Sequence, residues 1–355
     1  MNLRLGVWLM AVLMLASVRA RAAPEDPSRP QWAGSFTFEN DLFFGTDKYY
    51  TDGVELELKR RPVERESPTA VSAAICPFIG CKDQPLLARH HHVGQLMYTP
   101  QRIGVHEAQP DDRPWAGLLY YSHSEDMLSP DGAALTTITE EIGVVGRYSY
   151  AEQTQKWIHR TFTGIPPRGW DNQIGGEIGL MLMAERRMAL PQLSSSNDDG
   201  VQLRGLWHWR AAAGNIMTFA EAGLTFVVGK DLPLVVERGP GPQTKGAFGG
   251  PSVARDRACV FSWLECTASA FVEARWVIRN MFLDGTMFRN GPSVDKRPFV
   301  ADVGASLRFT LPRTKSDLTG AWYAEFRATR RTPEFYSRLR VEPQTFGALT
   351  IGTDF

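Results

Sequence analysis

A two-residue alternation of apolar and polar side chains is the feature that most constrains how this chain can fold. Between residues 300 and 311 (VADVGASLRFTL) the odd positions are apolar, and most even positions are polar or charged. The same alternation recurs at residues 54–59, at residues 322–327 and around residues 270–276. Successive side chains of a β-strand point to opposite faces, so this period predicts strands with one apolar and one polar face. The predicted fold class is all-β.

Two all-β architectures produce this alternation. A soluble sandwich hides the apolar face in a core, whereas a membrane barrel turns it toward lipid and keeps the polar side chains in the lumen. The barrel is favoured because the strand segments are about 10 residues long, as a tilted spanning strand requires. Short turns also alternate with longer insertions. Finally, the chain ends in an alternating segment whose last residue, Phe355, resembles the carboxy-terminal aromatic of bacterial outer-membrane barrels.

About twelve strands are expected. They lie near residues 33–41, 51–61, 90–99, 114–124, 134–144, 175–188, 200–212, 216–228, 267–280, 298–311, 319–330 and 345–355. An even number lets a barrel close with both chain ends on the periplasmic side. No linker divides the chain, so residues 23–355 are expected to form one transmembrane antiparallel β-barrel.

The amino terminus has the layout of a secretory signal peptide. Arg4 precedes an apolar run at residues 5–18, and Ala20-Arg21-Ala22 offers a small-x-small cleavage site. The run is shorter than the ~20 residues of a spanning helix, so residues 1–22 are expected to be removed. Export and a barrel together predict the outer membrane of a Gram-negative envelope. The formal net charge of +0 and the dispersed arginines argue against a nucleic-acid partner.

The four cysteines form two close pairs, Cys76/Cys81 and Cys259/Cys266, in segments rich in turn-forming or polar residues. In an exported chain each pair is expected to form a local disulfide, because neither has the CxxC spacing of a metal site. The run of histidines at residues 90–92 has the chemistry to bind a transition metal. It is expected instead to lie solvated at a strand entrance.

Oxygen-bearing side chains gather where the first predicted strand ends and the second begins. They are Asn40, Asp41, Thr51 and Asp52. Carboxylate, amide and hydroxyl oxygens at a strand terminus suit a hard cation such as calcium, or a polar substrate. The alternative is an ordinary polar hairpin turn.

Residues 151–160 depart from the strand pattern and are expected to form an amphipathic helix between strands five and six. Trp157 and Ile158 are expected to pack inward. His159 lies on the same helix, where it is either a satisfied packing residue or a base that activates a water molecule.

A set of short motifs resembles the lipid A 3′-O-deacylase family of outer-membrane barrels, over nearly the whole mature chain. In chain order the motifs are residues 39–41 (END), 50–53 (YTDG), 110–117 (PDDRPWAG), 155–159 (QKWIH), 169–173 (GWDNQ), 293–296 (SVDK) and 331–335 (RTPEF). The resemblance implies a twelve-stranded barrel that binds lipid A, or lipopolysaccharide, among the outer-membrane lipids. It implies removal of the 3′-linked acyl chains by calcium-dependent ester hydrolysis.

The resemblance also implies roles for individual residues. Asn40, Asp41 and Thr51 match site positions on the first two strands, with Asn40 and Asp41 as calcium ligands, and His159 matches the catalytic histidine. One position departs from the family pattern, because Ile165 stands where a carboxylate is expected. Either Glu152 or Asp171 replaces that carboxylate, or the chain is a non-catalytic barrel, a narrow channel or a structural protein. A GxSxG nucleophile motif is absent, which argues against a serine hydrolase.

Overall fold

The structure is a computed structural model that describes residues 31–46, 48–61, 66–163, 166–198, 200–230, 232–236, 265–311 and 321–353. The signal peptide predicted at residues 1–22, Cys259, Ile165 and Phe355 all lie outside these ranges. No helix in the described ranges is long and apolar enough to cross a bilayer.

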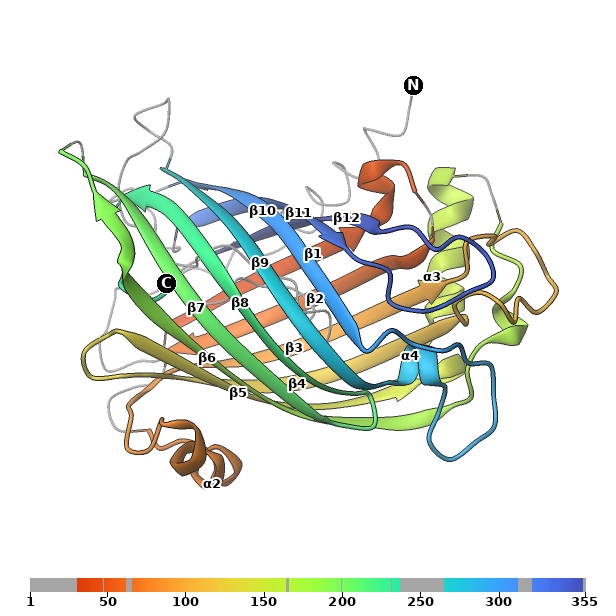
Figure 1. Ribbon diagram of the computed structural model, residues 1–355, viewed down its shortest axis with the longest axis horizontal. Helices are drawn as coiled ribbons and strands as arrows, with labels where there is room; N and C mark the ends of the chain where they lie inside the picture. Colours follow the sequence, from red (N-terminus) through yellow and green to blue (C-terminus); the bar gives the residue numbers. More distant parts are fainter. Residues whose placement is uncertain are drawn as a thin grey trace.

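Twelve strands form one closed antiparallel barrel, which confirms the predicted fold (Figure 1). Each strand pairs with its neighbours in the sequence, and β1 pairs with β12 to close the barrel. The strands are β1 (Gln31–Asn40), β2 (Tyr49–Arg61), β3 (Leu86–Thr99), β4 (Ala116–Leu128), β5 (Ala134–Val145), β6 (Glu177–Ser196), β7 (Val201–Gly214), β8 (Met217–Lys230), β9 (Glu265–Asn280), β10 (Phe299–Leu311), β11 (Trp322–Arg331) and β12 (Gln344–Thr353). The largest differences from prediction are the longer β3 and β6.

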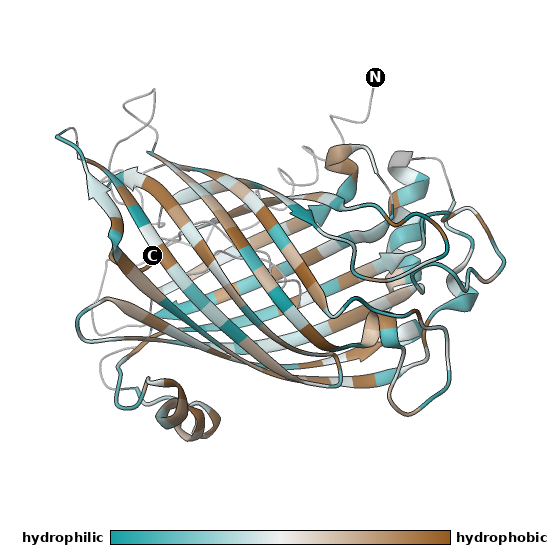
Figure 2. Cartoon of the chain, in the orientation of Figure 1, coloured by the Kyte–Doolittle hydropathy of each residue, from teal (hydrophilic) through white to brown (hydrophobic). Residues whose placement is uncertain are grey.

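Hydrophilic and hydrophobic residues alternate along the strands (Figure 2), and the two faces of the wall have opposite polarity, as predicted. On β2, Leu56 and Leu58 are exposed on the outer face, whereas Glu55 and Glu57 point into the lumen. An apolar outer face beside a polar interior is the arrangement of a membrane barrel and not of a sandwich.

The connections at the two ends of the barrel differ. Both chain ends meet the barrel at one end, here called the terminal end, and the opposite end is called the site rim. The site rim carries η1 (Asp41–Phe44), η2 (Gly146–Ser149), α3 (Ala151–Ile158), η3 (His159–Thr163), η4 (Trp170–Asn172) and α4 (Met281–Asp284). Short turns and longer insertions do not strictly alternate as predicted, because α2 (Ala70–Ile79) joins β2 to β3 at the terminal end.

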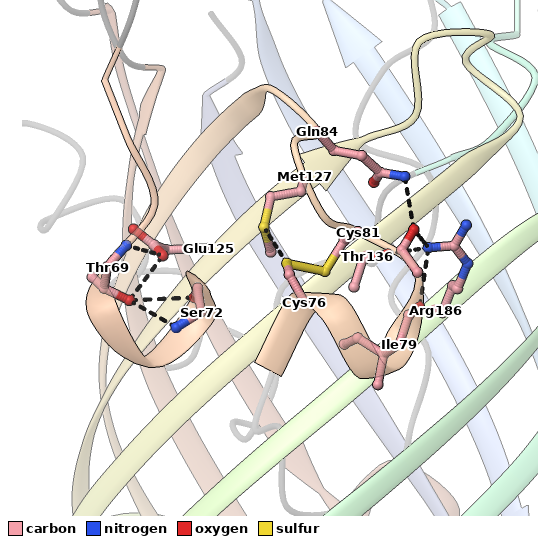
Figure 3. The surroundings of a disulfide bond; sticks show 11 residues. Thr69, Ser72, Cys76, Ile79, Cys81, Gln84, Glu125, Met127, Thr136 and Arg186 are labelled. Atoms are coloured by element: carbon pink, nitrogen blue, oxygen red, sulfur yellow. Dashed lines mark hydrogen bonds between the residues drawn. A yellow bond between two sulfur atoms is a disulfide. The ribbon is translucent and has the colours of Figure 1, made fainter. Parts of the chain in front are cut away.

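Helix α2 packs on the outside of the barrel wall near the terminal end (Figure 3). Cys76 and Cys81 are joined by a disulfide, which confirms the first predicted pair. The cysteines pack against Met127 of β4 and Ile138 of β5, both on the outer face. The segment was expected to be turn-rich, but it is a helix whose end is closed by Gly80 at a φ of 81°.

The lumen is filled with packed side chains. Toward the site rim, the aromatic rings of Tyr50, Tyr98 and Phe346 lie in one apolar cluster, and Phe282 of α4 stacks on Tyr98 with ring centroids 4.4 Å apart. Next to this cluster, arginines and carboxylates from neighbouring strands form ion pairs across the interior.

The histidine run also lies in the wall of the barrel and not at a solvated strand entrance. His90 and His92 are buried in the lumen, whereas His91 is on the outer face with a hydrogen bond to Tyr121. That prediction was wrong because three identical residues in a row hide the alternation of the strand on which they lie.

Candidate functional site

The oxygen cluster lies on the lipid-facing side of the barrel, at the site rim. Asn40 of β1 is directly opposite Asp52 of β2, which is opposite Met97 of β3, which is opposite Gly117 of β4. These four positions lie on the outer face. Asn40 and Asp52 have the same parity as the exposed Trp32 and Leu56 of their strands, and directly paired residues point to the same face. The row therefore crosses four neighbouring strands on the outside of the wall.

A bulge in β2 adds Thr51 to this row. The register between β2 and β3 shifts between Tyr50 and Asp52, so Thr51 is the extra residue. Tyr50 points into the lumen, where its hydroxyl donates to Glu39, while the Thr51 hydroxyl lies 2.6 Å from that of Thr99. The bulge thus places Thr51 and Asp52 on the same outer face.

The polar residues of this face are buried, which is unusual for the outside of a barrel. Asn40, Thr51 and Asp52 are 3%, 3% and 1% exposed, whereas Leu56 on the same face of β2 is 57% exposed. We call these three residues the polar floor. Protein must cover them, because a lipid-facing position is otherwise open.

One cover is the short helix η1, which folds back over the outer wall. Phe43 of η1 makes edge-to-face contacts with Phe38 and Phe326, and it lies against Gly347, where a Cβ would come within 2.9 Å of its ring. The Asn40 side chain caps η1 by accepting a hydrogen bond of 2.7 Å from the Leu42 amide.

Asp41 holds the turn that follows. Its Oδ2 accepts hydrogen bonds from the Thr46 hydroxyl at 2.9 Å and from the Lys48 amide at 2.8 Å. The structure therefore places Asp41 beside the polar floor, with one carboxylate oxygen engaged in shaping the loop.

Helix α3 lies over the neighbouring strands β3 and β4. Residues at a helical spacing of three to four form its inner face, which consists of Ala151, Gln155, Ile158 and His159. Ala151 sits on Gly117, where an added Cβ would lie 2.4 Å from the Ala151 Cβ. The glycine is what allows the helix to approach the strand so closely.

Aromatic residues fix α3 in place. Trp170 of η4 is buried, and its indole N–H donates to the Gln155 side chain at 2.7 Å. Trp115 packs on Trp170 with ring centroids 5.0 Å apart. Gln155 belongs to the motif at residues 155–159, but no role was predicted for it, although its four-residue spacing from Ala151 and His159 was visible in the helical period.

The predicted helix is present, and His159 follows its last residue with only 2% exposure. Trp157 and Ile158 were both expected to pack inward, which is correct for Ile158 only. Ile158 packs against the cluster under the helix, but Trp157 is 44% exposed on the other side.

The two carboxylates suggested as replacements at position 165 have other partners. Glu152 forms an ion pair with Lys156 one turn along α3. Asp171 is exposed and lies 3.5 Å from the exposed ring of His106.

The donor chemistry of the polar floor and its neighbour fits a hard cation. Asn40, Asp41 and Asp52 supply one amide and two carboxylates where β1 and β2 meet, and Thr51 adds a hydroxyl. Oxygen donors of this kind are the ligands that calcium takes in proteins.

Buried charges hold the neighbouring loops of the site rim. Arg113 lies 2.6 Å from Glu334 and over the ring of Tyr98 at 4.3 Å. Burial alone raises the pKa of Glu334, but the charges of Arg113 and Arg331 outweigh it and lower the pKa from 4.5 to about 2. These loops are therefore anchored by a carboxylate that stays ionised.

The closed twelve-stranded wall with its apolar outer face defines an integral outer-membrane β-barrel protein. More narrowly, a sequence profile described as outer membrane protein LpxR matches residues 7–355, so the chain belongs to the LpxR family of outer membrane proteins. Among proteins with curated descriptions, none matches the sequence.

Comparison with solved structures gives one match that supports this fold. LpxR from Salmonella typhimurium is 18% identical, with a TM-score of 0.67 over 91% of this chain and 100% of that chain. The translocator domain of the autotransporter NalP from Neisseria meningitidis is 9% identical, with a TM-score of 0.38 over 99% of this chain and 95% of that chain.

Proposed function

We propose that this protein is an outer-membrane lipid A deacylase that hydrolyses 3′-linked acyl esters, with His159 as the base and calcium as the cofactor. The proposal rests on family membership and on one structural observation. The polar floor is a buried group of hydrogen-bonding side chains on the lipid-facing side of a barrel. Such groups are costly at a lipid interface unless they serve a polar ligand.

The dimensions of the row and the helix support a role for His159. Two strand spacings separate Gly117 from Asp52, which is roughly 10 Å. From Ala151 to His159 the chain rises about 12 Å if the helical rise continues. Helix α3 contacts β4, where Ala151 sits on Gly117, and β3. We propose that it continues toward β2, which would bring His159 over the polar floor.

The surroundings of the polar floor suit a lipid substrate. Leu42, Phe43 and Phe44 of η1 are partly exposed on one side, and Trp157 of α3 is partly exposed on the other. Apolar side chains beside a polar floor match a molecule that carries acyl chains next to a polar ester and sugar.

The chemistry assigned to the residues is a simple hydrolysis. The His159 ring takes a proton from the attacking water and returns it to the sugar oxygen that leaves, which yields a free fatty acid and an alcohol. Asn40 and Thr51 orient the ester carbonyl. Calcium held by oxygens of Asn40 and Asp41 would supply Lewis-acid stabilisation of the oxyanion.

The test is release of fatty acid from lipid A by purified, folded protein in detergent with calcium. His159→Ala should lower the rate by about 10²–10⁴-fold, the usual contribution of a general base. His106→Ala is the matched control, because His106 is an exposed histidine at the same rim. Removing calcium with a chelator should also stop the release. Equal rates for both variants and the unmodified chain would exclude His159 as the base, and no release from any of them would favour a structural barrel.

Ile165→Glu tests the departure from the family pattern. A higher rate would show that the missing carboxylate limits the enzyme. An unchanged rate in a fully active, calcium-dependent chain would show that another side chain fills that role.

A further inference from the structure

A second group of potential ligands lies in the lumen, on the opposite face of the wall from the polar floor. Glu57 of β2 faces His92 of β3 directly, and His90 is the next lumen-facing residue of β3. Each of the three offers one ligand atom, and these atoms lie within 4.8 Å of one another. The two imidazole rings are parallel, with centroids 5.9 Å apart.

The atoms around this group are arranged as in the outer shell of a metal site. His90 Nδ1 lies 2.6 Å from Glu57 Oε1, while its Nε2 lies 3.0 Å from Asp126 Oδ2. Ser35 donates a hydrogen bond of 2.9 Å to the other Glu57 oxygen. Metal-binding histidines commonly place their second nitrogen on a carboxylate in this way, which fixes the tautomer and the ring orientation.

His92 adds a second, independent observation. Its side chain is 2% exposed, and neither ring nitrogen has a hydrogen-bond partner of normal geometry. The nearest polar atom recorded is Glu55 Oε1, 3.3 Å from Nδ1, and Glu55 in turn accepts a hydrogen bond of 2.6 Å from Tyr120. A buried imidazole without a good hydrogen bond is costly unless another ligand satisfies it.

This group differs from the other carboxylate–histidine cluster of the lumen in the charged residues that surround it. His208, Glu221 and Glu273 also lie within 4.8 Å of one another. There, however, Glu221 accepts hydrogen bonds from both Arg210 and Arg275, so two guanidinium groups already neutralise it. The hydrogen-bond partners of Glu57 are a histidine and a serine, which a metal ion can displace or retain, and the nearby cation Lys59 acts on it through its charge.

We propose that Glu57, His90 and His92 form a binding site for a divalent transition metal, with zinc the best match among the common ions. Two imidazoles and a carboxylate are a ligand set that zinc uses in proteins, with further positions left for water. Tetrahedral zinc needs donor atoms about 3.3 Å apart. The His90 and Glu57 atoms, 2.6 Å apart, would therefore open by roughly 0.7 Å, and the wider pairs would close by roughly 1.5 Å or less. The side chains of His90 and Glu57 are 10% and 11% exposed, which leaves a path from the water of the lumen.

The alternative to a bound metal ion is a bound proton. In that state His90 is an imidazolium held between the carboxylates of Glu57 and Asp126. Both states use the same contacts, so metal binding must release a proton and weaken as the pH falls. The two states are distinguished by measuring binding directly. The site is separate from the polar floor, so the result is independent of deacylase activity.

The experiment is calorimetric titration of Zn²⁺ into folded, chelator-treated protein in detergent, with excess calcium present to fill oxygen sites. The unmodified chain should bind one Zn²⁺ per chain, and His92→Gln should weaken that binding at least 100-fold. His91→Gln is the matched control, because His91 is the adjacent histidine on the outer face. Asp126→Asn, which removes the carboxylate behind His90, should weaken binding by about 10–100-fold.

Cobalt provides a readout that needs no variant. Co²⁺ bound by the unmodified chain should give the visible absorption bands of a low-coordinate N₂O site, and Zn²⁺ should bleach them. Absence of these bands, or equal Zn²⁺ affinity in the unmodified, His91→Gln and His92→Gln proteins, would overturn the proposal and leave the imidazolium between its carboxylates.

Discussion

At the scale of single residues, the site rim depends on a carboxylate that stays charged in a buried position. Glu334 is 8% exposed and pairs with Arg113, and the two arginines beside it lower its pKa from 4.5 to about 2. A carboxylate whose pKa is lowered by folding stabilises the folded state at pH values above the pKa that it has in the unfolded chain. That stabilisation is lost as the pH falls toward the folded value.

We therefore expect the free energy of unfolding to decrease between about pH 4.5 and pH 2 through this residue. The change is about 3 kcal/mol, from the shift of the pKa. Urea unfolding of the folded barrel at several pH values measures it. Glu334→Gln should be less stable at pH 7 and should show a smaller pH dependence over that range. An identical pH dependence in both proteins would contradict the assignment.

Residues of the site could be predicted only in part. Asn40, Thr51 and Asp52 were brought together correctly, because they lie at the two ends of one hairpin. The position of Thr51 on the same outer face was not predictable, since it depends on the bulge in β2. The lumen position of His90 and His92 was missed because no apolar residue separates them in the sequence.

At the scale of elements, the strands were predictable and the covering helices were less so. Alternation identifies a strand without knowledge of its partner, which is why all twelve were found. The outer packing of α3 depends instead on Gly117, far from it in sequence. Helix α2 was missed because its apolar residues surround a cysteine and a proline, which suggested a turn.

The contact between α3 and Gly117 gives a prediction for activity. Gly117→Ala puts a methyl group 2.2 Å from the Ser149 hydroxyl and 2.4 Å from Ala151, so α3 must move away from the wall. A displacement near 1 Å should lower acyl release by roughly 10²-fold while the barrel stays folded. Gly104→Ala is the matched control, since nothing lies within 4 Å of the added methyl. Full activity of Gly117→Ala would show that α3 does not position the catalytic base.

Helix α2 gives a prediction about lipid contact. It carries no charged residue, it packs on the outer face of the wall, and Phe78 is 88% exposed. We expect this face to contact acyl chains near the terminal end. A photoreactive amino acid at position 78 should therefore crosslink to phospholipid in vesicles, as detected by mass spectrometry. The same label at position 131, in the exposed β4–β5 turn, should not. Labelling of both positions to the same extent would place α2 in water.

At the scale of the whole molecule, the lumen does not resemble a channel. Aromatic rings pack across it near the site rim, and Arg275 links Glu221 to Asp302 through contacts of 2.8 and 3.2 Å. We expect reconstituted protein to show no stable single-channel conductance in planar bilayers. Folded protein, identified by heat-modifiable migration, is needed for this measurement. Regular, voltage-independent current steps would instead support the narrow-channel alternative.

The position of the polar floor on the outer face of the barrel changes how a ligand can reach it. A ligand that stays in the outer leaflet meets the floor by lateral diffusion within the membrane plane, without crossing the lumen or entering the water. Under the proposed function, the rate of encounter then depends on the surface density of lipid A around each barrel. The loops of the site rim can consequently vary in length or charge without obstructing access, provided that the protein covering the polar floor admits the ligand from the bilayer side.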